Sequence, residues 1–356
     1  PVQIATATGF VRELALAADV QGNAVAAWRT NGTTDDLFAA RYDATTKLWS
    51  AAASLESGAG DVDVGPSVAM SASGKAMVVY QQIDGTATKV FYNLHNGQSW
   101  SARAALPSQG SKPDRAVRVV SNGLEDFFAA WYSEESKFTY ALRALRYDGA
   151  TAAWETTAKV LAAKVSSTGE IPLTASPAGA AVGWRVRPAT GSGSNFLVAR
   201  WVAGSWSAAT DVSQNGLSYV YSPTIAMNLS GDVYAAWEQP SAVTDAGVTK
   251  GAKLRIYDAL AMTWSAPKVL GPDGDAIRIA LDAAGNGFIT WDEYSAGLKG
   301  ARILNGQVGT ATQLTPPRQG WVDTHTLIAN ACGQGLLALR YANEGPISSP
   351  EYLVFR

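Results

Sequence analysis

The feature that most constrains this sequence is a unit of about 52 residues that recurs from one end of the chain to the other. Each unit carries a segment related to Gly-x-x-x-x-x-Trp, and we call the residue that closes this segment the first-series position. Leu339 occupies this position in the seventh copy, and the other six hold Trp28, Tyr80, Trp131, Trp184, Trp237 and Trp291. The recurrence predicts a repeat architecture, whereas a length of 356 residues alone suggests two or three unrelated domains.

A second aromatic series lies between the members of the first. Its members are Trp49, Trp100, Trp154, Trp206 and Trp264, with Val308 at the sixth position. No seventh member occurs before the C-terminus, but residues 1–4 match residues 267–270, which closely follow Trp264. The sequence therefore predicts that the N-terminus supplies the last strand of the seventh unit.

Each unit divides into four short apolar segments separated by turn residues. In the second unit these segments are 66–70, 76–80, 89–93 and 100–106. A short polar residue recurs three positions before the Gly position of the first turn in six of the copies, as Asp19, Ser71, Asn122, Asn228, Asp282 and Asn330. Such residues hydrogen-bond their own backbone in tight turns, and the Gly residues beside them accept positive φ. We therefore expect four antiparallel strands in every unit.

Four-stranded antiparallel sheets repeated around an axis are the blades of a β-propeller. Segments such as 24–28 (AVAAW) are apolar at every position, as expected of strands covered on both faces. We therefore predict an all-β, seven-bladed β-propeller that forms a single domain over residues 1–356. The N-terminal strand completes the seventh blade in this prediction, so that the ring closes and leaves no partly unpaired blade.

Charge and hydropathy exclude some partners. A net charge of −2 and the absence of any Lys/Arg run predict no nucleic-acid partner. No stretch approaches about 18 consecutive apolar residues, so we expect no membrane insertion. Cys332 stands alone and has no internal disulfide partner. The chain begins at Pro1 and is rich in Trp, Gly, Thr and Asn, from which we expect an exported protein that is secreted, periplasmic or on the cell surface.

The repeat resembles that of a known group of proteins. The pattern is Asp/Asn-x-x-Gly-Asn-x-x-x-x-Trp, with Trp-Ser-x-Pro-x-x-Leu about 20 residues later, and it is clearest at 18–28, 264–270 and 281–291. It is similar to repeats of exported bacterial β-propeller proteins that are loosely grouped with the sialidase-like, or BNR-repeat, superfamily. The resemblance implies a propeller located outside the cytoplasm, but it implies little about catalytic activity. True sialidases carry Ser-x-Asp-x-Gly-x-x-Trp boxes and an Arg-Ile-Pro signature, which do not occur here, so no catalytic residues are transferred.

The predicted strand order places the links between units and the turns between second and third strands at one end of each sheet, which we call the link end. The other turns lie at the opposite, turn end. Because loops on a rigid scaffold commonly form binding sites, we predict the site at the link end. The residues that follow the first-series positions lie there, namely Arg29, Gln81, Tyr132, Arg185, Glu238, Asp292 and Arg340. They are interpreted either as solvated strand ends or as a ring whose three Arg side chains grip carboxylate or phosphate groups.

Segments that depart from the repeat are further candidates, because the scaffold does not require them. The link 213–223 brings Tyr219 and Tyr221, and the turn 238–250 is long enough to act as a flap. The link 315–326 brings Arg318, Trp321, Asp323 and His325. Exposed aromatic rings next to polar groups suit the stacking and hydrogen bonding of a sugar ring. Alternatively, Trp321 covers the seam between blades six and seven, where Val308 leaves the second series short of volume.

Patterns for catalysis and metal binding are scarce. The two histidines, His95 and His325, offer no zinc-site spacing, and we place His95 at the turn end. Residues 61–63 and 273–275 resemble fragments of calcium loops without the full run of oxygen ligands, so we expect no cofactor and keep calcium as a weak alternative. Glu238, Asp292 and Glu293 are candidate carboxylates for glycoside hydrolysis, which needs two carboxyl groups roughly 5–10 Å apart.

The leading functional hypothesis is a non-catalytic recognition module that binds a glycan or an extracellular protein through the link end. The first alternative is a glycan-active hydrolase or lyase that uses carboxylates at the channel mouth. The second is a structural module of a surface assembly. An enzyme is expected to bring titratable groups with displaced pKa values into one pocket.

Deletion of residues 1–5 should lower the free energy of unfolding by an amount on the order of several kcal/mol, because an unpaired sheet edge and core positions would be opened. Denaturant unfolding of the truncated and full chains measures the difference. A truncated chain as stable as the full chain would show that the two ends do not share a sheet.

Overall fold

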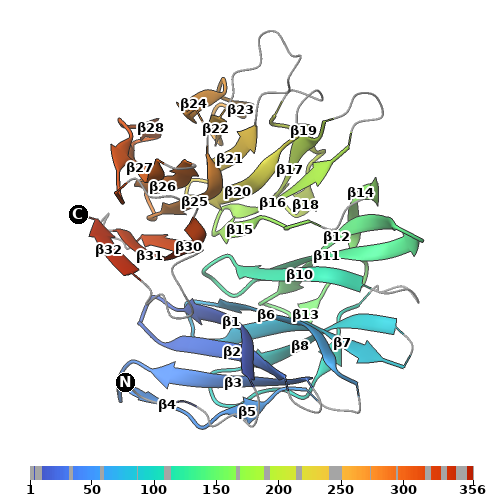
Figure 1. Ribbon diagram of the computed structural model, residues 1–356. Coiled ribbons are helices and arrows are strands. Elements are labelled where there is room, and N and C mark those ends of the chain that lie inside the picture. Colours follow the sequence, from blue (N-terminus) through green and yellow to red (C-terminus); the bar gives the residue numbers. More distant parts are fainter. Residues whose placement is uncertain are drawn as a thin grey trace. The chain divides into compact units, whose positions relative to one another are not determined.

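The computed structural model describes residues 4, 10–31, 35–56, 60–85, 87–107, 114–165, 169–187, 193–213, 219–239, 251–272, 274–293, 296–316, 322–329, 335–341 and 351–355. In 322–326, at 329 and beyond, the description covers the backbone alone. Every regular element in these ranges is a β-strand (Figure 1). Within the same ranges there is no helix with the length and apolarity needed to cross a bilayer.

The described strands form seven sheets, which we number along the chain. Sheet 1 consists of β1 (Phe10–Ala18), β2 (Ala24–Asn31), β3 (Asp35–Asp43), β4 (Leu48–Trp49) and β5 (Ala53–Ser54). Sheet 2 consists of β6 (Val62–Met70), β7 (Ala76–Asp84), β8 (Ala87–His95) and β9 (Ala104–Ala105). Sheet 3 consists of β10 (Asp114–Ser121), β11 (Phe127–Ser136), β12 (Thr139–Asp148), β13 (Ala153–Trp154) and β14 (Lys159–Val165).

The later sheets repeat this order. Sheet 4 consists of β15 (Leu173–Ser176), β16 (Gly179–Val186), β17 (Asn195–Val202), β18 (Ser205–Trp206) and β19 (Thr210–Asp211). Sheet 5 consists of β20 (Tyr221–Met227), β21 (Val233–Gln239), β22 (Gly251–Asp258), β23 (Thr263–Trp264) and β24 (Lys268–Gly271). Sheet 6 consists of β25 (Asp275–Leu281), β26 (Gly287–Glu293), β27 (Gly297–Leu304), β28 (Gln307–Val308) and β29 (Thr312–Gln313). Sheet 7 consists of β30 (Val322–Ala329), β31 (Gly335–Tyr341) and β32 (Glu351–Phe355).

The predicted four-stranded unit is confirmed for six of these sheets. Each of the six contains four neighbouring strands in chain order, so each sheet spans a narrow band of colour in Figure 1. In sheet 2, the expected segments 66–70, 76–80 and 89–93 lie within β6, β7 and β8, and the strands pair antiparallel. Sheet 7 has three described strands. Residues 1–3, which we predicted to begin its fourth strand, lie outside the described residues.

The fourth strand of the unit is interrupted directly after the second-series residue. In sheet 1 it appears as β4 and β5, which both pair with β3. The Ser50 hydroxyl occupies the break: it accepts a hydrogen bond from Arg41 N and donates one to Ala51 O, each at 3.0 Å. Ser101, Ser207 and Ser265 make the equivalent pairs of bonds in sheets 2, 4 and 5. The recurring Trp-Ser sequence thus supplies a side-chain acceptor where the strand ladder is broken.

The turns between first and second strands have the predicted chemistry. Asp19 Oδ1 accepts hydrogen bonds from the backbone N–H groups of Gln21 and Asn23, each at 2.9 Å. Asp282 makes the same two bonds, to the residues two and four positions ahead. Gly22, which lies between Gln21 and Asn23, has φ of 87°, a conformation that residues with a Cβ rarely adopt. Short polar residues and Gly therefore recur here because the hairpin requires them.

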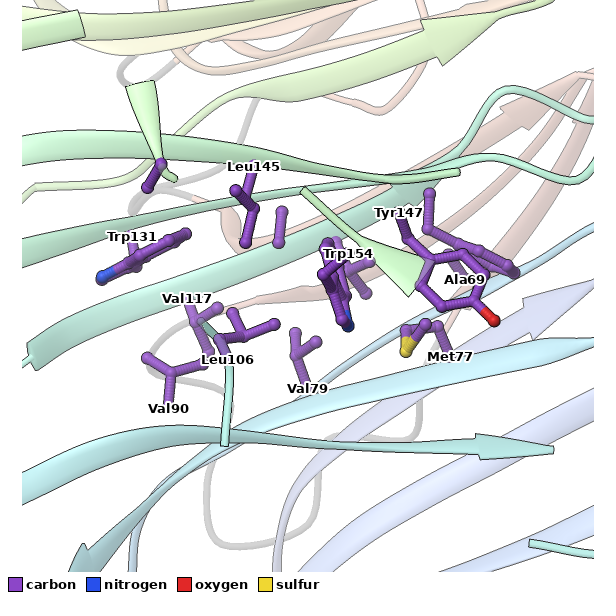
Figure 2. Close-up of a cluster of buried hydrophobic side chains, with 14 residues drawn as sticks. Ala69, Met77, Val79, Val90, Leu106, Val117, Trp131, Leu145, Tyr147 and Trp154 are labelled. Atoms are coloured by element: carbon purple, nitrogen blue, oxygen red, sulfur yellow. The ribbon is translucent and has the colours of Figure 1, made fainter. Parts of the chain in front are cut away.

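The hydrophobic cores lie between consecutive sheets. One cluster joins Met77 and Val79 of sheet 2 to Trp131, Tyr147 and Trp154 of sheet 3. Figure 2 shows these side chains meeting in the space between the ribbons of the two sheets. Equivalent clusters join sheets 1 and 2, sheets 4 and 5, and sheets 5 and 6. The strands of a blade are apolar on both sides because both sides of the sheet are covered.

The chain divides into two compact units, unit 1 (Pro1–Pro177) and unit 2 (Ala178–Arg356). Sheets 1–3 belong to unit 1, and sheets 5–7 belong to unit 2. In unit 1, Ile4 packs against Ala26, Trp28 and Ala40 of sheet 1. A single domain over residues 1–356 and a closed seven-bladed ring stay predictions.

The inter-sheet core should dominate the stability of unit 1. Trp131 is fully buried, and Trp131→Ala should lower the free energy of unfolding by roughly 3–5 kcal/mol, because the sheets cannot close the cavity completely. The control Leu260→Ala, at a side chain that is 95% exposed, should change it by less than about 0.5 kcal/mol. Denaturant unfolding measures both. Equal effects of the two changes would contradict the inter-sheet core.

Candidate functional site

A cavity of about 450 Å³ opens at the turn end of sheets 1 and 2, within unit 1. From sheet 1, β3 and the segment after it contribute Arg41, Asp43 and Trp49 to its lining. From sheet 2, β8 and the turn after it contribute His95 and Trp100. We call this cavity the turn-end pocket. Its volume lies in the range of pockets that hold small ligands.

The pocket lies where one copy of the repeat departs from an aromatic pair. In four sheets a third-strand aromatic ring packs on the second-series Trp, with ring centroids 5.5–5.8 Å apart, in the pairs Tyr42–Trp49, Tyr147–Trp154, Trp201–Trp206 and Tyr257–Trp264. In sheet 2 the equivalent residue is His95, whose ring lies 5.0 Å from that of Trp100. The imidazole ring of His95 is smaller than the Tyr or Trp side chain that occupies this position in those four sheets.

His95 is a buried, neutral hydrogen-bonding group. Its Nδ1 accepts a hydrogen bond from Gly97 N at 3.1 Å, so the imidazole proton lies on Nε2. Burial lowers the pKa of His95, and the charge of Arg41 lowers it further. Both effects favour the neutral ring.

Arg41 and Asp43 supply charge to the lining. Arg41 Nη1 donates to Gly97 O at 2.8 Å, whereas the buried Arg41 Nε has no acceptor among the described residues. Asp43 Oδ1 accepts from the backbone N–H groups of Thr45 and Thr46, each at 2.8 Å. The bond from Thr46 is the main reason that the pKa of Asp43 is lowered, so this exposed carboxylate is ionised at neutral pH.

The lining therefore combines aromatic faces with convergent polar groups. Trp49 and Trp100 are half-buried, so each leaves part of its indole open to the cavity or to solvent. Arg41 contributes a guanidinium group, and Asp43 offers carboxylate acceptors. Within the described ranges, no group of three or more His, Cys, Asp or Glu side chains could hold a metal ion. This chemistry suits a polyhydroxylated ligand with an apolar face.

The pocket lies at the turn end, whereas we predicted a site at the link end. At the link end, three of the predicted residues form hydrogen bonds between consecutive sheets. Arg29 Nη1, Gln81 Nε2 and Arg185 Nη1 donate to the carbonyl oxygens of Val62, Asp114 and Val220, at 2.9, 2.6 and 3.0 Å respectively. Each acceptor lies at the entry to the next sheet. Arg29 also forms ion pairs with Glu13 and Asp35, at 2.8 and 3.0 Å.

The other described members of the proposed ring are also integrated into the fold. Gln81, Tyr132 and Asp292 are at most 3% exposed, so the interpretation as solvated strand ends is wrong for them. Asp292 pairs in register with Asp275. Glu293, our further catalytic candidate, forms an ion pair of 2.6 Å with Lys299. Burial of these positions follows from the covering of both sheet faces, which extends to the strand ends.

The structure does bring three predicted residues together in sheet 5. The rings of Tyr219 and Tyr221 lie 6.2 Å apart at the link end, and they are 43% and 42% exposed. Glu238 lies opposite Tyr221 in the register of β20 and β21. These three residues are the described part of the link-end site, and ligand binding by them stays a prediction.

The remaining candidates are outside the described part of the chain. Arg318, Trp321 and most of the turn 238–250 are not described, and for Asp323, His325 and Arg340 the description covers only the backbone, in β30 and β31. The two calcium-loop fragments differ: Asp273 is outside the described residues, whereas Asp63 Oδ2 accepts a hydrogen bond from Thr88 at 3.3 Å.

One titratable group was missed by sequence reasoning. Asp114 is the first residue of β10 and is 1% exposed. Burial raises its pKa to about 6, although the Ser133 hydroxyl and the charges of Lys89 and Arg143 act in the opposite direction. The sequence signal that could have identified Asp114 is an acidic residue at the start of a unit's first strand, directly after the link from the preceding unit.

Comparisons with known proteins identify the fold. No protein-family model matches the sequence, and no curated protein matches it. Among solved structures, the chain is similar to the polysaccharide lyase Uly1 (10% identity over 93% of this chain and 87% of that chain, TM-score 0.57). It is also similar to the β-propeller domain of the Trilobed protease from Pyrococcus furiosus (8% identity over 97% and 95%, TM-score 0.55). A leech intramolecular trans-sialidase matches at 9% identity over 99% of this chain and 70% of that chain, with a TM-score of 0.50. The likeness shows a β-propeller fold.

Asp114 should make stability depend on pH. Its carboxyl stays protonated in the folded chain between about pH 4 and pH 6, where the unfolded carboxyl has ionised, so the free energy of unfolding falls as the pH rises through this range. Asp114→Asn should remove about 3 kcal/mol of that fall and stabilise the protein at pH 7 but not at pH 4. Denaturant unfolding at both pH values tests this. The same effect at both would contradict it.

Proposed function

We propose that this β-propeller recognises a glycan without transforming it. The observation that carries the proposal is the turn-end pocket, in which Trp49 and Trp100 share one lining with Arg41 and Asp43. The apolar face of a sugar ring stacks on indole, and its hydroxyl groups both donate and accept hydrogen bonds. Sugar hydroxyl groups would accept from the Arg41 guanidinium group and donate to the Asp43 carboxylate.

The proposed ligand is an extracellular or cell-surface glycan, and the protein acts outside the cytoplasm. A polysaccharide lyase and a trans-sialidase are among the structures to which the chain is similar, which agrees with a carbohydrate ligand on this scaffold. The recognition needs no cofactor, because the pocket residues supply the stacking surface and the hydrogen bonds. We also propose that the chain is a repeat protein of bacterial origin.

A second candidate function is a glycan-active hydrolase or lyase. Asp114 favours it, because a buried carboxyl with a pKa of about 6 is suited to donating a proton near neutral pH. Against it, Asp114 is not among the residues that line the described pocket. Recognition therefore remains the better-supported function.

We also propose that the seven sheets form one closed ring, with the N-terminal strand completing sheet 7. The packing of Ile4 against sheet 1 supports closure, because it places the N-terminal segment beside the first sheet. The propeller domain from Pyrococcus furiosus has an open velcro topology, so closure is not required of every propeller of this kind.

The substitution His95→Tyr should separate binding from folding. It restores the aromatic residue that other copies carry, and its phenol should fill the pocket beside Trp100. We expect the affinity for the best ligand of a glycan array to fall by about tenfold or more, with the free energy of unfolding changed by less than about 1.5 kcal/mol. Calorimetric titration and denaturant unfolding measure the two effects.

The matched control is the reverse exchange at the equivalent position of sheet 5, where Tyr257 packs on Trp264. Tyr257→His should lower stability and leave glycan affinity unchanged. Array binding by the parent chain that His95→Tyr leaves intact, or no glycan bound at all, would refute the proposal. Release of new reducing ends or unsaturated sugars from the bound glycan would favour the enzyme instead.

A further inference from the structure

Three sheets place a cation directly opposite the first-series Trp. In register, Trp131 faces Arg143 in sheet 3, and Trp291 faces Lys299 in sheet 6. In sheet 5, Trp237 faces Lys253. All three cations lie on the third strand, toward the link end, so the same position of the repeat can be compared three times within one chain.

In sheets 3 and 6 a carboxylate neutralises this cation. Lys299 Nζ lies 2.6 Å from Glu293 Oε2, and Trp291 Nε1 donates to Glu293 Oε1 at 3.0 Å. Arg143 Nη2 lies 2.7 Å from Glu135 Oε1. Both arrangements follow the general rule that a cation removed from water acquires a counter-charge.

Sheet 5 keeps the lysine but lacks the carboxylate. Gln239 stands two residues after Trp237, as Glu293 stands two residues after Trp291. Its Oε1 accepts from Lys253 Nζ at 2.9 Å and from Trp237 Nε1 at 3.3 Å. An amide oxygen provides a hydrogen bond but no negative charge. Among the described residues, no carboxylate forms an ion pair with Lys253.

The amide nitrogen of Gln239 is a second donor without an acceptor. Gln239 is fully buried, and its Nε2 has no hydrogen-bond partner among the described residues. Lys253 is 9% exposed, and burial lowers its pKa. Gln239 ends β21 and Lys253 is the third residue of β22, so both lie near the link end of unit 2. One buried ammonium group and one unsatisfied N–H group therefore adjoin each other, and no carboxylate among the described residues neutralises the charge.

We propose that Lys253 and Gln239 bind the carboxylate group of a ligand. A carboxylate has two oxygens, so it can accept from Lys253 Nζ and Gln239 Nε2 together while supplying the charge that Glu293 supplies in sheet 6. The ligand class is a carboxylated sugar or a simple carboxylate. This site is separate from the turn-end pocket, which lies in unit 1 and at the other end of its sheets.

The decisive variant is Gln239→Glu, which gives sheet 5 the ion pair of sheet 6. We expect the parent chain to bind galacturonate, and Gln239→Glu to lower that affinity by about tenfold or more because its own carboxylate occupies the donors. Titration calorimetry with galacturonate, acetate and galactose measures the binding. Galactose, which lacks a carboxylate, should not bind here. Acetate bound as tightly as galacturonate assigns the site to simple carboxylates, and weaker acetate binding assigns it to carboxylated sugars.

The matched control is the opposite exchange in the neighbouring sheet. Glu293→Gln gives sheet 6 the arrangement of sheet 5 and should add a second site, raising the stoichiometry of galacturonate from one to two. Lys253→Met, which removes the ammonium group, should abolish binding to the original site and provides a second test if Glu293→Gln does not fold. The proposal is overturned if the parent chain binds neither carboxylate, or if Gln239→Glu and Lys253→Met bind as the parent does. His95→Tyr should leave this binding unchanged, so failure here and failure of glycan recognition are distinguishable.

Discussion

Burial of aromatic side chains between consecutive sheets is the interaction on which the rest of this structure depends. Tyr80, Trp131, Trp237 and Trp291 are each fully buried, and each belongs to a cluster shared by two sheets. A single unit has no partner for either face of its sheet, so it cannot bury these side chains alone. Full burial of one large apolar side chain contributes about 1.5–3 kcal/mol, and such residues recur in consecutive sheets. Neighbouring units are therefore a condition for each unit to fold.

Tight inter-sheet packing also determines which polar residues remain available for function. A strand end that meets the next sheet needs its backbone carbonyl satisfied, and the donors nearest to it are the side chains that follow the first-series positions. Arg29 and Gln81 are used in this way in unit 1, and Arg185 is used in this way in unit 2. A ring of charged residues in the sequence of a propeller can therefore report the packing of blades, and chemistry must be sought at positions that this packing does not use.

The sequence predicted the fold well because each repeat encodes local chemistry that several other copies confirm. Asp19 and Gly22 define a hairpin without reference to distant residues, whereas the break after Trp49, which the Ser50 hydroxyl occupies, was not predicted. The pocket was not predicted, because only the strand register, which pairs His95 with Trp100, shows that His95 occupies the position of an aromatic residue in other copies. The sequence marks Asp114 only by its place directly after a link, because the burial that raises its pKa arises from the contacts of two sheets.

Both proposed sites lie at positions where a copy departs from most of the others while the scaffold around it stays constant. His95 replaces a Tyr or Trp and is accompanied by a cavity, whereas Gln239 replaces a carboxylate and is accompanied by an uncompensated lysine. Neither departure improves packing or charge balance, since an unfilled cavity and an unneutralised buried cation both cost stability. Residues that cost stability without a compensating contact are expected where a ligand provides the missing contact. The two sites suit different ligand groups: a sugar face with hydroxyl groups in unit 1, and a carboxylate in unit 2. Both kinds of group occur together in acidic polysaccharides.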